Sequence, residues 1–213
     1  MALSGGPPPA PQRPTGGGET GVSCQAVATV VGLVALAGAF ALIILASVLV
    51  PVVRRSKEQG YRAKCLSNER ALGIAFQSYA NDHGGYLPDG GQWVTQIGLY
   101  TGSSPPSAPY YGGVTLDDMM TCPSVVKLPV ARTYGFNSEL SGRLQGQVAR
   151  PADIVALFES SAFTHDPSDP GTSLVRPGRH GHGNNCCFAD GHAQWCADGA
   201  PLRFRLSAPG ARP

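Results

Sequence analysis

The residues best suited to chemistry gather in one short segment near the C-terminus, which contains His180, His182, Asp190 and His192. Imidazole nitrogens together with a carboxylate are suitable ligands for Zn²⁺ or another transition metal. The alternative is architectural, with His180 bonding across a hairpin and Asp190 accepting hydrogen bonds from turn amides. We favour the architectural interpretation, in which His180, Asp190, Gly191 and His192 form a structural motif.

The hairpin is predicted by Asp190-Gly191, because Asp-Gly between two short strand-forming runs is a strong turn signal. Glycine tolerates the positive φ that a tight turn needs. A two-residue turn at this point places Cys187 opposite Gln194 and directs Phe188 toward a long helix. The sequence thus predicts a specific register for the last two strands.

Patterns that would favour catalysis are missing from the chain. Ser160, Ser161 and His165 form no recognisable nucleophile elbow, and no Gly-rich phosphate loop follows a predicted strand. The formal net charge of +2 is close to neutral, which argues against a nucleic-acid-binding surface. We therefore expect neither an enzyme nor a nucleic-acid-binding protein.

A second group of potential ligands, Asn81, Asp82 and Asp89, surrounds a Gly-rich turn. Oxygen atoms of this kind are the ligands that Ca²⁺ prefers. The same residue types also cap helices and form turns, and we prefer that explanation. We expect no cofactor, with Ca²⁺ or Zn²⁺ as the alternatives.

The elements that position these residues begin with an apolar segment, Gln25 to Val53, which has no charged side chain. A helix of about 20 apolar residues crosses the ~30 Å hydrocarbon core of a bilayer, so residues 23–53 are predicted to form a transmembrane helix. A cleaved signal peptide has an apolar core of only ~7–15 residues and fits this segment poorly. Residues 1–22, rich in Pro and Gly, are predicted to be disordered.

Two signals conflict over the side of the membrane on which the following domain lies. A basic cluster after the helix favours the cytoplasm by the positive-inside rule. This cluster consists of Arg54, Arg55, Lys57, Arg62 and Lys64. Cysteines without CxxC spacing instead indicate disulfides outside the reducing compartment. These cysteines are Cys65, Cys122, Cys186, Cys187 and Cys196.

An amphipathic helix is predicted to continue beyond the membrane segment. Its apolar stripe, at helical spacing, consists of Tyr61, Cys65, Leu72, Phe76 and Tyr79. Pro51 lies inside the long helix and removes one backbone hydrogen bond, so we expect a kink there. The helix should end near residues 81–85, where glycine can adopt the left-handed conformation of a C-cap.

The rest of the chain is expected to form short elements and loops. Residues 93–100 are predicted to form a short helix. The strand candidates are residues 134–137, 154–159, 185–189 and 192–195. One amphipathic helix lying on a small antiparallel sheet is an α+β arrangement. This domain is predicted to cover residues 54–205, followed by a loose tail over residues 206–213.

Several segments in the same order resemble a known family. Arg62–Pro88 is similar to the second half of the long helix in bacterial prepilin-like proteins. The shared pattern is, in order, basic residues, Cys, a Ser/Asn pair, Leu-Gly, Tyr-Ala-Asn and Gly-Tyr before Pro. Met120–Val125 and Arg132–Ser138 resemble their mid-domain segments. His180, followed after nine residues by Asp190-Gly191, resembles the C-terminal motif of type II secretion or type IV pilin-like proteins described as prepilin-type processing-associated.

This resemblance implies a pilin-like fold, in which one long N-terminal helix, half in the membrane and half amphipathic, packs on a small antiparallel sheet. It implies a single-pass protein of the cytoplasmic membrane with an extracytoplasmic domain. The implied role is a structural or assembly component of a type II secretion or type IV pilus-like system, with pilin-like subunits or secretion-system proteins as partners. The family pattern carries both Cys65 and Cys122 and implies a disulfide between them, with buried free thiols as the alternative.

The start of the membrane helix departs from the family pattern. Prepilins of this kind carry Gly-Phe-Thr-Leu-Ile-Glu there, whereas this chain has GETGVSCQAVATVVG. Because the Gly-Phe junction and the Glu are missing, we expect the N-terminal tail to stay in the mature protein. The alternatives to a secretion component are a membrane-tethered extracytoplasmic binding domain on a pilin-like scaffold and a metal-dependent envelope enzyme.

Overall fold

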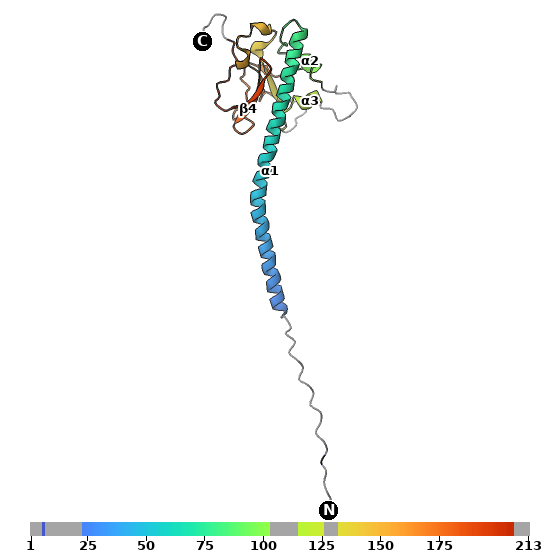
Figure 1. Ribbon diagram of the computed structural model, residues 1–213, viewed down its shortest axis with the longest axis vertical. Coiled ribbons are helices and arrows are strands. Elements are labelled where there is room, and N and C mark those ends of the chain that lie inside the picture. Colours follow the sequence, from blue (N-terminus) through green and yellow to red (C-terminus); the bar gives the residue numbers. More distant parts are fainter. Residues whose placement is uncertain (1–5, 7–22, 103–114, 126–131, 207–213) are drawn as a thin grey trace, which may run out of the picture. The chain divides into compact units, whose positions relative to one another are not determined.

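Figure 1 shows the computed structural model, with the three α-helices and strand β4 labelled. The structure describes residues 6, 23–102, 115–125 and 132–206. The predicted disordered segment 1–22 and loose tail 206–213 lie almost entirely outside the described residues. The chain divides into two compact units, residues 1–51 and 52–213, and each is described by itself.

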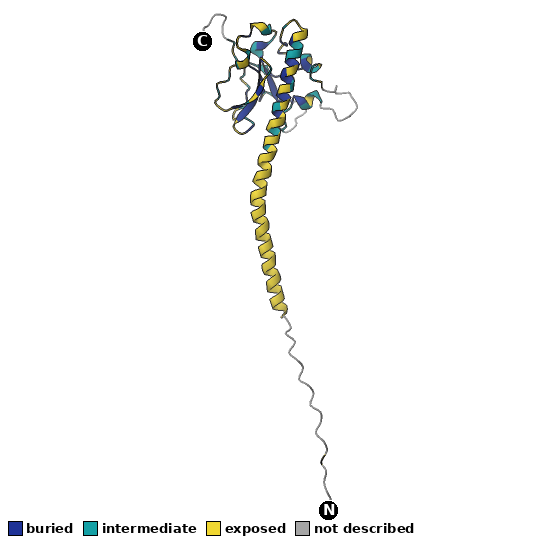
Figure 2. Cartoon of the chain, in the orientation of Figure 1, coloured by how far each residue is buried: buried dark blue, intermediate teal, exposed yellow. Residues whose placement is uncertain are grey.

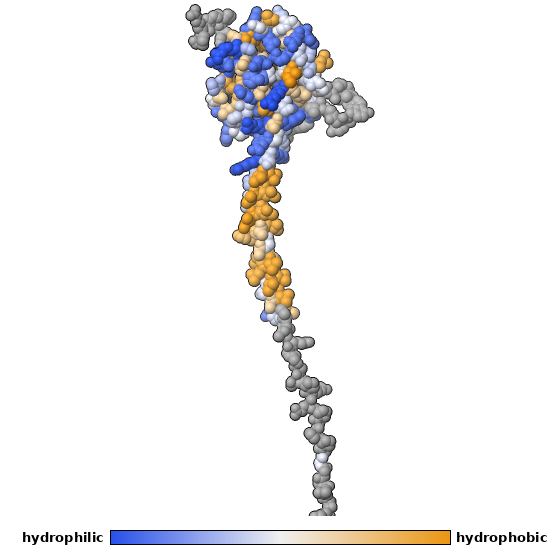
Figure 3. Space-filling view, in the orientation of Figure 1, coloured by the Kyte–Doolittle hydropathy of each residue, from blue (hydrophilic) through white to orange (hydrophobic). Residues whose placement is uncertain are grey.

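The first unit consists, in its described part, chiefly of the apolar beginning of helix α1, Cys24–Asp82. Every residue from Cys24 to Pro51 is exposed, and Figure 2 colours this stretch as exposed throughout. Valine, leucine and isoleucine side chains cover much of it, and Figure 3 colours most of the face in view as hydrophobic. The helix is long and apolar enough to cross a membrane, and an exposed apolar surface of this size is typical of a segment that binds a membrane or another partner.

In the second unit, α1 becomes an amphipathic helix, as its apolar stripe predicted. The helix is continuous through Pro51. Its first buried residue is Cys65, and Leu72 and Phe76 are buried on the same stripe. The helix ends as expected: the backbone N–H of Gly85, at φ 88°, donates to the carbonyl of Ala80 over 2.7 Å.

A five-stranded sheet packs against this part of α1, with strand order β3-β1-β2-β4-β5. The strands are β1 (Tyr134–Asn137), β2 (Val155–Glu159), β3 (Ser168–Asp169), β4 (Gly183–Phe188) and β5 (Ala193–Ala197). The four predicted strands are confirmed within two residues at each end. The α+β class is therefore correct.

The sheet is mixed rather than antiparallel, which corrects the predicted arrangement. β1, β2, β4 and β5 pair antiparallel, whereas β3 pairs parallel to β1. After β2 the chain reverses and passes to the far side of β1. A strand that reverses from β2 runs in the same direction as β1, because β1 is itself antiparallel to β2.

Shorter helices complete the domain. They are α2 (Trp93–Gly98), α3 (Leu116–Met119) and the 3₁₀ turns η1 (Ser138–Leu140), η2 (Gln145–Gln147) and η3 (Pro151–Asp153). The predicted helix over residues 93–100 corresponds to α2. Its two most buried large side chains, Trp93 and Ile97, are one helical turn apart, so one face of α2 meets the core.

The β4–β5 hairpin has a different register from the predicted one. Cys187 pairs with Ala193, not with Gln194. The connection has three residues: the N–H of Gly191, at φ 92°, donates to the carbonyl of Phe188, and the N–H of Phe188 donates to the carbonyl of His192. A turn closed by a positive-φ glycine is a common three-residue hairpin connection, and it shifts the pairing by one residue.

The two faces of β4 contribute to different hydrophobic cores. Cys187 packs in the main core beside α1, whereas Phe188 packs on the opposite face of the sheet with Val155 and Phe158. The prediction that Phe188 contacts the long helix is therefore wrong. The close approach of Cys187 to the helix requires Gly73, where an added Cβ would lie 2.6 Å from the Cys187 sulfur.

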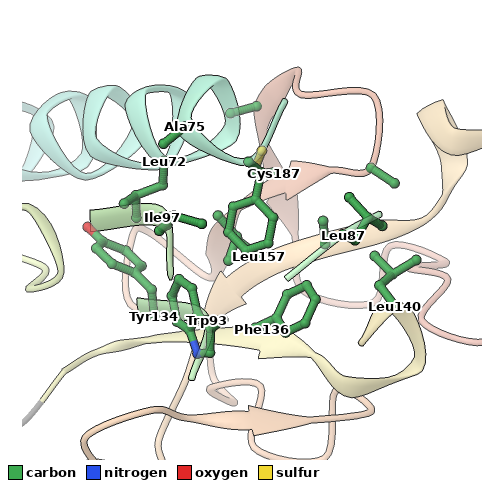
Figure 4. Close-up of a cluster of buried hydrophobic side chains, with 14 of the residues drawn as sticks. Leu72, Ala75, Leu87, Trp93, Ile97, Tyr134, Phe136, Leu140, Leu157 and Cys187 are labelled. Atoms are coloured by element: carbon green, nitrogen blue, oxygen red, sulfur yellow. The ribbon is translucent and has the colours of Figure 1, made fainter. Parts of the chain in front are cut away.

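The main core lies between α1, α2 and the sheet, and Figure 4 shows its central side chains. Those labelled are Leu72, Ala75, Leu87, Trp93, Ile97, Tyr134, Phe136, Leu140, Leu157 and Cys187. Full burial of a large apolar side chain contributes about 1.5–3 kcal/mol. The core therefore holds the amphipathic half of α1 firmly on the sheet, and its polar margin contains the candidate site.

Candidate metal centre

Four side chains from distant parts of the sequence converge at this margin: Cys65, Cys122, Glu159 and His180. One ligand atom from each, a sulfur, a carboxylate oxygen or an imidazole nitrogen, lies within 4.8 Å of the other three. All four residues are buried, with at most 1% of their surface exposed. This group is called the Cys₂-Glu-His cluster below.

Each member is positioned by its own structural element. Cys65 is on the buried stripe of α1, and Glu159 is the last residue of β2. Cys122 follows α3, and its backbone N–H donates to the Thr133 hydroxyl over 2.6 Å. His180 lies in the loop before β4, where its own carbonyl accepts a hydrogen bond from the Trp195 indole.

Short contacts link the four side chains into a network. The Cys65 thiol donates to Glu159 Oε1 over 2.7 Å, and His180 Nε2 lies 2.9 Å from the same oxygen. His180 Nε2 is also 3.3 Å from Cys122 Sγ. The Tyr134 hydroxyl donates to Cys65 Sγ over 3.0 Å and fixes the position of that sulfur from the side of β1.

The imidazole of His180 has an inner and an outer nitrogen. Nε2 faces the cluster, whereas Nδ1 lies 2.9 Å from Glu58 Oε1 and 3.5 Å from the Ser124 hydroxyl. The Glu58 side chain is 44% exposed. An open pocket leads to this outer edge; its lining residues are Arg55, Glu58, Gln59, Arg62, His180 and Gly181.

Two buried carboxyl groups near the cluster have oxygen atoms without a hydrogen-bond partner among the described residues. These atoms are Glu159 Oε2 and both side-chain oxygens of Glu69. Both residues are fully buried. Burial, followed by the charge of Glu159, raises the pKa of the Glu69 carboxyl well above its ordinary value. The site thus gathers acidic side chains in the protein interior, where an unpaired charge is costly.

The protonation of the cluster reflects these contacts. Burial lowers the pKa of His180, but hydrogen bonds to Cys122 and Glu159 outweigh it and raise the pKa to about 10. Side-chain hydrogen bonding with Cys65, and then with His180, lowers the pKa of Cys122 to about 5 despite burial. Burial raises the pKa of Cys65. The geometry therefore favours a Cys122 thiolate beside a His180 imidazolium.

Such a group can do one of two things chemically. A thiolate next to an imidazolium is the arrangement of a cysteine nucleophile, but Cys122 has no exposed surface through which a substrate could reach it. Two sulfurs, one imidazole and one carboxylate are also a complete four-ligand set for a transition metal. The burial of all four side chains favours a closed structural site.

The histidine segment singled out in the sequence is divided in the structure. His180 enters the Cys₂-Glu-His cluster without His182, Asp190 or His192. His192 lies at the hairpin tip, where its Nδ1 is 2.6 Å from Asp190 Oδ1 and its ring stacks on Phe188. The structure therefore does not bring this candidate metal set together, because the strand β4 separates His180 from the tip of its hairpin.

The architectural expectation holds in part. The N–H of His192 donates to Asp190 Oδ1 over 3.1 Å, so Asp190 accepts from a turn amide as predicted. The side chain of His180 bonds to Glu58 and the cluster rather than across the hairpin. Asp89, a candidate Ca²⁺ ligand, accepts from the N–H of Gly91 over 2.8 Å, which is ordinary turn chemistry.

The cysteines are free thiols in the structure. Cys65 and Cys122, for which the family pattern implied a disulfide, are unlinked members of the cluster, and the disulfide stays a prediction. Cys186 and Cys196 pack together on the outer face of the sheet, while Cys187 faces α1.

Sequence reasoning missed Glu69 and Glu159. Glu69 follows Cys65 by four positions and precedes Leu72 by three, so it falls on the buried stripe of α1. A carboxyl at that spacing was a recognisable signal. Glu159 ends a strand of five buried residues, and only the tertiary structure brings it to Cys65.

Comparison of this chain with protein-family models, with curated proteins and with solved structures gave no match. The site is interpreted from its geometry.

Proposed function

We propose that this chain is a pilin-like protein of the bacterial cell envelope, anchored by α1 in the cytoplasmic membrane and serving as a structural or assembly component of a type II secretion or type IV pilus-like system. The observation that carries the proposal is the change of character within α1. Residues 24–51 expose apolar side chains on all faces, whereas from Cys65 onward one face is buried against a sheet. In a pilin-like subunit, one half of the long helix contacts lipid and the other half packs against the domain.

The proposed role is structural rather than enzymatic. The thiols and the imidazole that are best suited to chemistry are enclosed in the Cys₂-Glu-His cluster. Among the described residues, most of the exposed large hydrophobic side chains belong to the anchor helix. We therefore propose that the protein acts through contacts between this helix and neighbouring subunits.

Small residues on one face of the anchor offer the close contact that helices in lipid require. Gly32, Ala35 and Ala39 fall on one side of α1 by helical spacing. An added Cβ at Gly32 meets no other described atom within 4 Å, so this face is open to a partner. Helices in membranes associate through small residues of this kind, because their backbones can then approach closely.

The proposal is tested by cross-linking the full chain in native membranes. Ala39→Leu should reduce cross-linked dimers and larger species severalfold, because it blocks the small-residue face. Ala41→Leu, on the opposite side of the helix, is the matched control and should leave the products unchanged. Equal effects of both variants, or a parent chain that remains monomeric, would contradict the proposal.

A further inference from the structure

We propose that Cys65, Cys122, Glu159 and His180 bind one Zn²⁺ ion, which fastens the long helix to the sheet. The four ligand atoms lie within 4.8 Å of one another. A tetrahedral zinc site, with Zn–S of about 2.3 Å and Zn–N or Zn–O of about 2.0–2.2 Å, needs ligand atoms about 3.4–3.8 Å apart. This inference is independent of the proposed assembly role.

The donor set suits zinc better than the other common metals. Ca²⁺ and Mg²⁺ take oxygen ligands, and here three of four donors are sulfur or nitrogen. Zinc accepts thiolate, imidazole and carboxylate together and is four-coordinate in structural sites. Because all four residues are buried, no open coordination position faces solvent.

The groups around the cluster are those expected to orient metal ligands. The outer Nδ1 of His180 lies 2.9 Å from Glu58 Oε1, which directs Nε2 toward Glu159 and Cys122. A carboxylate on the far nitrogen of a ligating histidine fixes its tautomer and orientation. The Tyr134 hydroxyl similarly holds Cys65 Sγ by a 3.0 Å hydrogen bond.

The buried acidic groups around the cluster also favour binding of a cation. Glu159 Oε2 and both oxygens of Glu69 are buried without a partner among the described residues. Together with two ionisable thiols they form a site whose charged forms are strongly disfavoured in the interior. A divalent ion next to Glu159 would compensate this charge, since buried charges are paired or bind metals.

Zinc binding exchanges protons for metal bonds. Contacts of 2.7 Å from Cys65 Sγ to Glu159 Oε1 and 3.3 Å from Cys122 Sγ to His180 Nε2 are shorter than the ligand separations of a zinc site. As the zinc bonds form, the protons of the Cys65 thiol and of the His180 imidazolium pass to solvent, and the side chains move apart by several tenths of an ångström. The open pocket beside His180 and Glu58 gives the ion and the protons a path.

The site lies at the first contact between α1 and the domain core. Cys65 is the first buried residue of α1, so the ion would lie where the helix first contacts the domain core. The other ligands come from β2, from the segment after α3 and from the loop before β4. One ion would therefore join four segments of the domain.

The test uses the full chain, purified from membranes in detergent under reducing conditions. Zinc is removed by a chelator, added back as a zinc salt, and measured by elemental mass spectrometry after dialysis. We expect one zinc per parent chain. Cys65→Ser and Cys122→Ser should lose it, whereas Cys187→Ser, which removes another buried thiol outside the cluster, should retain it.

A second variant tests the orientation of the His180 ring without removing a zinc ligand. Glu58→Gln removes the carboxylate that faces His180 Nδ1 and should weaken zinc affinity about 10–100-fold. Glu139→Gln, a carboxylate outside the cluster, is its control. Should a cysteine variant fail to fold, Co²⁺ added to the parent chain provides a second measurement, because thiolate-to-cobalt charge-transfer bands report sulfur ligands.

Three results would overturn the proposal. The first is a parent chain that binds no stoichiometric zinc and gives no cobalt–thiolate bands. The second is zinc that remains in both cysteine variants, which would place it on other ligands. The third is a Cys65–Cys122 disulfide, found by peptide mapping of the parent chain alkylated in native membranes before reduction.

Discussion

At the scale of single residues, Glu69 is a buried carboxyl group that makes stability depend on pH. It is fully buried on α1, and neither of its oxygens has a hydrogen-bond partner among the described residues. Burial and the nearby charge of Glu159 raise its pKa well above 4.5. The folded chain therefore keeps a proton on Glu69 at a pH at which the unfolded chain has released it.

This difference makes stability depend on pH. Above about pH 4.5 the folded state binds one proton more than the unfolded state, so the free energy of unfolding falls as the pH rises, by up to about 1.4 kcal/mol per pH unit. Glu69→Gln removes the titrating carboxyl group, so the variant does not lose this part of its stability as the pH rises. With chelator present throughout, we expect the stability of the variant relative to the parent to grow from about pH 5 to about pH 8.

Denaturant unfolding of both chains across this range measures the effect. The relevant quantity is the difference in the free energy of unfolding between variant and parent, because other titrating groups are common to both. A difference that stays constant with pH would show that Glu69 ionises freely in the folded protein.

At the scale of elements, the contact between α1 and the β4–β5 hairpin depends on a glycine. A Cβ at Gly73 would lie 2.6 Å from Cys187 Sγ and 2.9 Å from the carbonyl oxygen of Gly191. The second neighbour is backbone and cannot turn away. Helix and hairpin are therefore packed as closely as the main chain permits.

Two identical substitutions in the same helix should have opposite effects. Gly73→Ala should destabilise the protein by about 1–3 kcal/mol, because it overpacks this contact. Gly60→Ala, at a position with nothing within 4 Å, should stabilise it by up to about 1 kcal/mol through helix propensity. Thermal unfolding of the full chain in detergent measures both, and equal shifts of either sign would contradict the close packing.

At the scale of the whole molecule, the orientation of the anchor decides the environment of the domain. The basic cluster that follows the apolar segment belongs to α1 itself, where Arg62 stacks on the Trp195 ring at 4.5 Å and Asn185 donates to the Arg62 carbonyl. Arg62 thus has a role within the domain, so it is weaker support for a cytoplasmic location than a free basic residue would be.

We expect the domain to be extracytoplasmic. A reporter that is active only outside the cytoplasm, fused after Pro213, should be active, and one that is active only in the cytoplasm should not. The two fusions serve as controls for each other, since both carry the same anchor. The reverse result would place the domain in the cytoplasm and refute this part of the proposed function.

Local patterns were sufficient to predict the long helix, its end near Gly85 and the approximate positions of four strands. Each depends on short-range physics: apolar periodicity, the absence of charge in residues 25–53, and the tolerance of glycine for positive φ. The apolar stripe through Cys65, Leu72 and Phe76 likewise identified the face of α1 that meets the core.

Only the tertiary structure decided the rest. The hairpin register changed because a three-residue connection competes with a two-residue one. Packing against α1 decided which face of β4 meets the helix, with Cys187 on that face and Phe188 on the other. The direction of β3 followed from the path of the chain after β2. The cluster could not be predicted, because Cys65, Cys122, Glu159 and His180 have no shared spacing and meet only when packing brings four separate segments together.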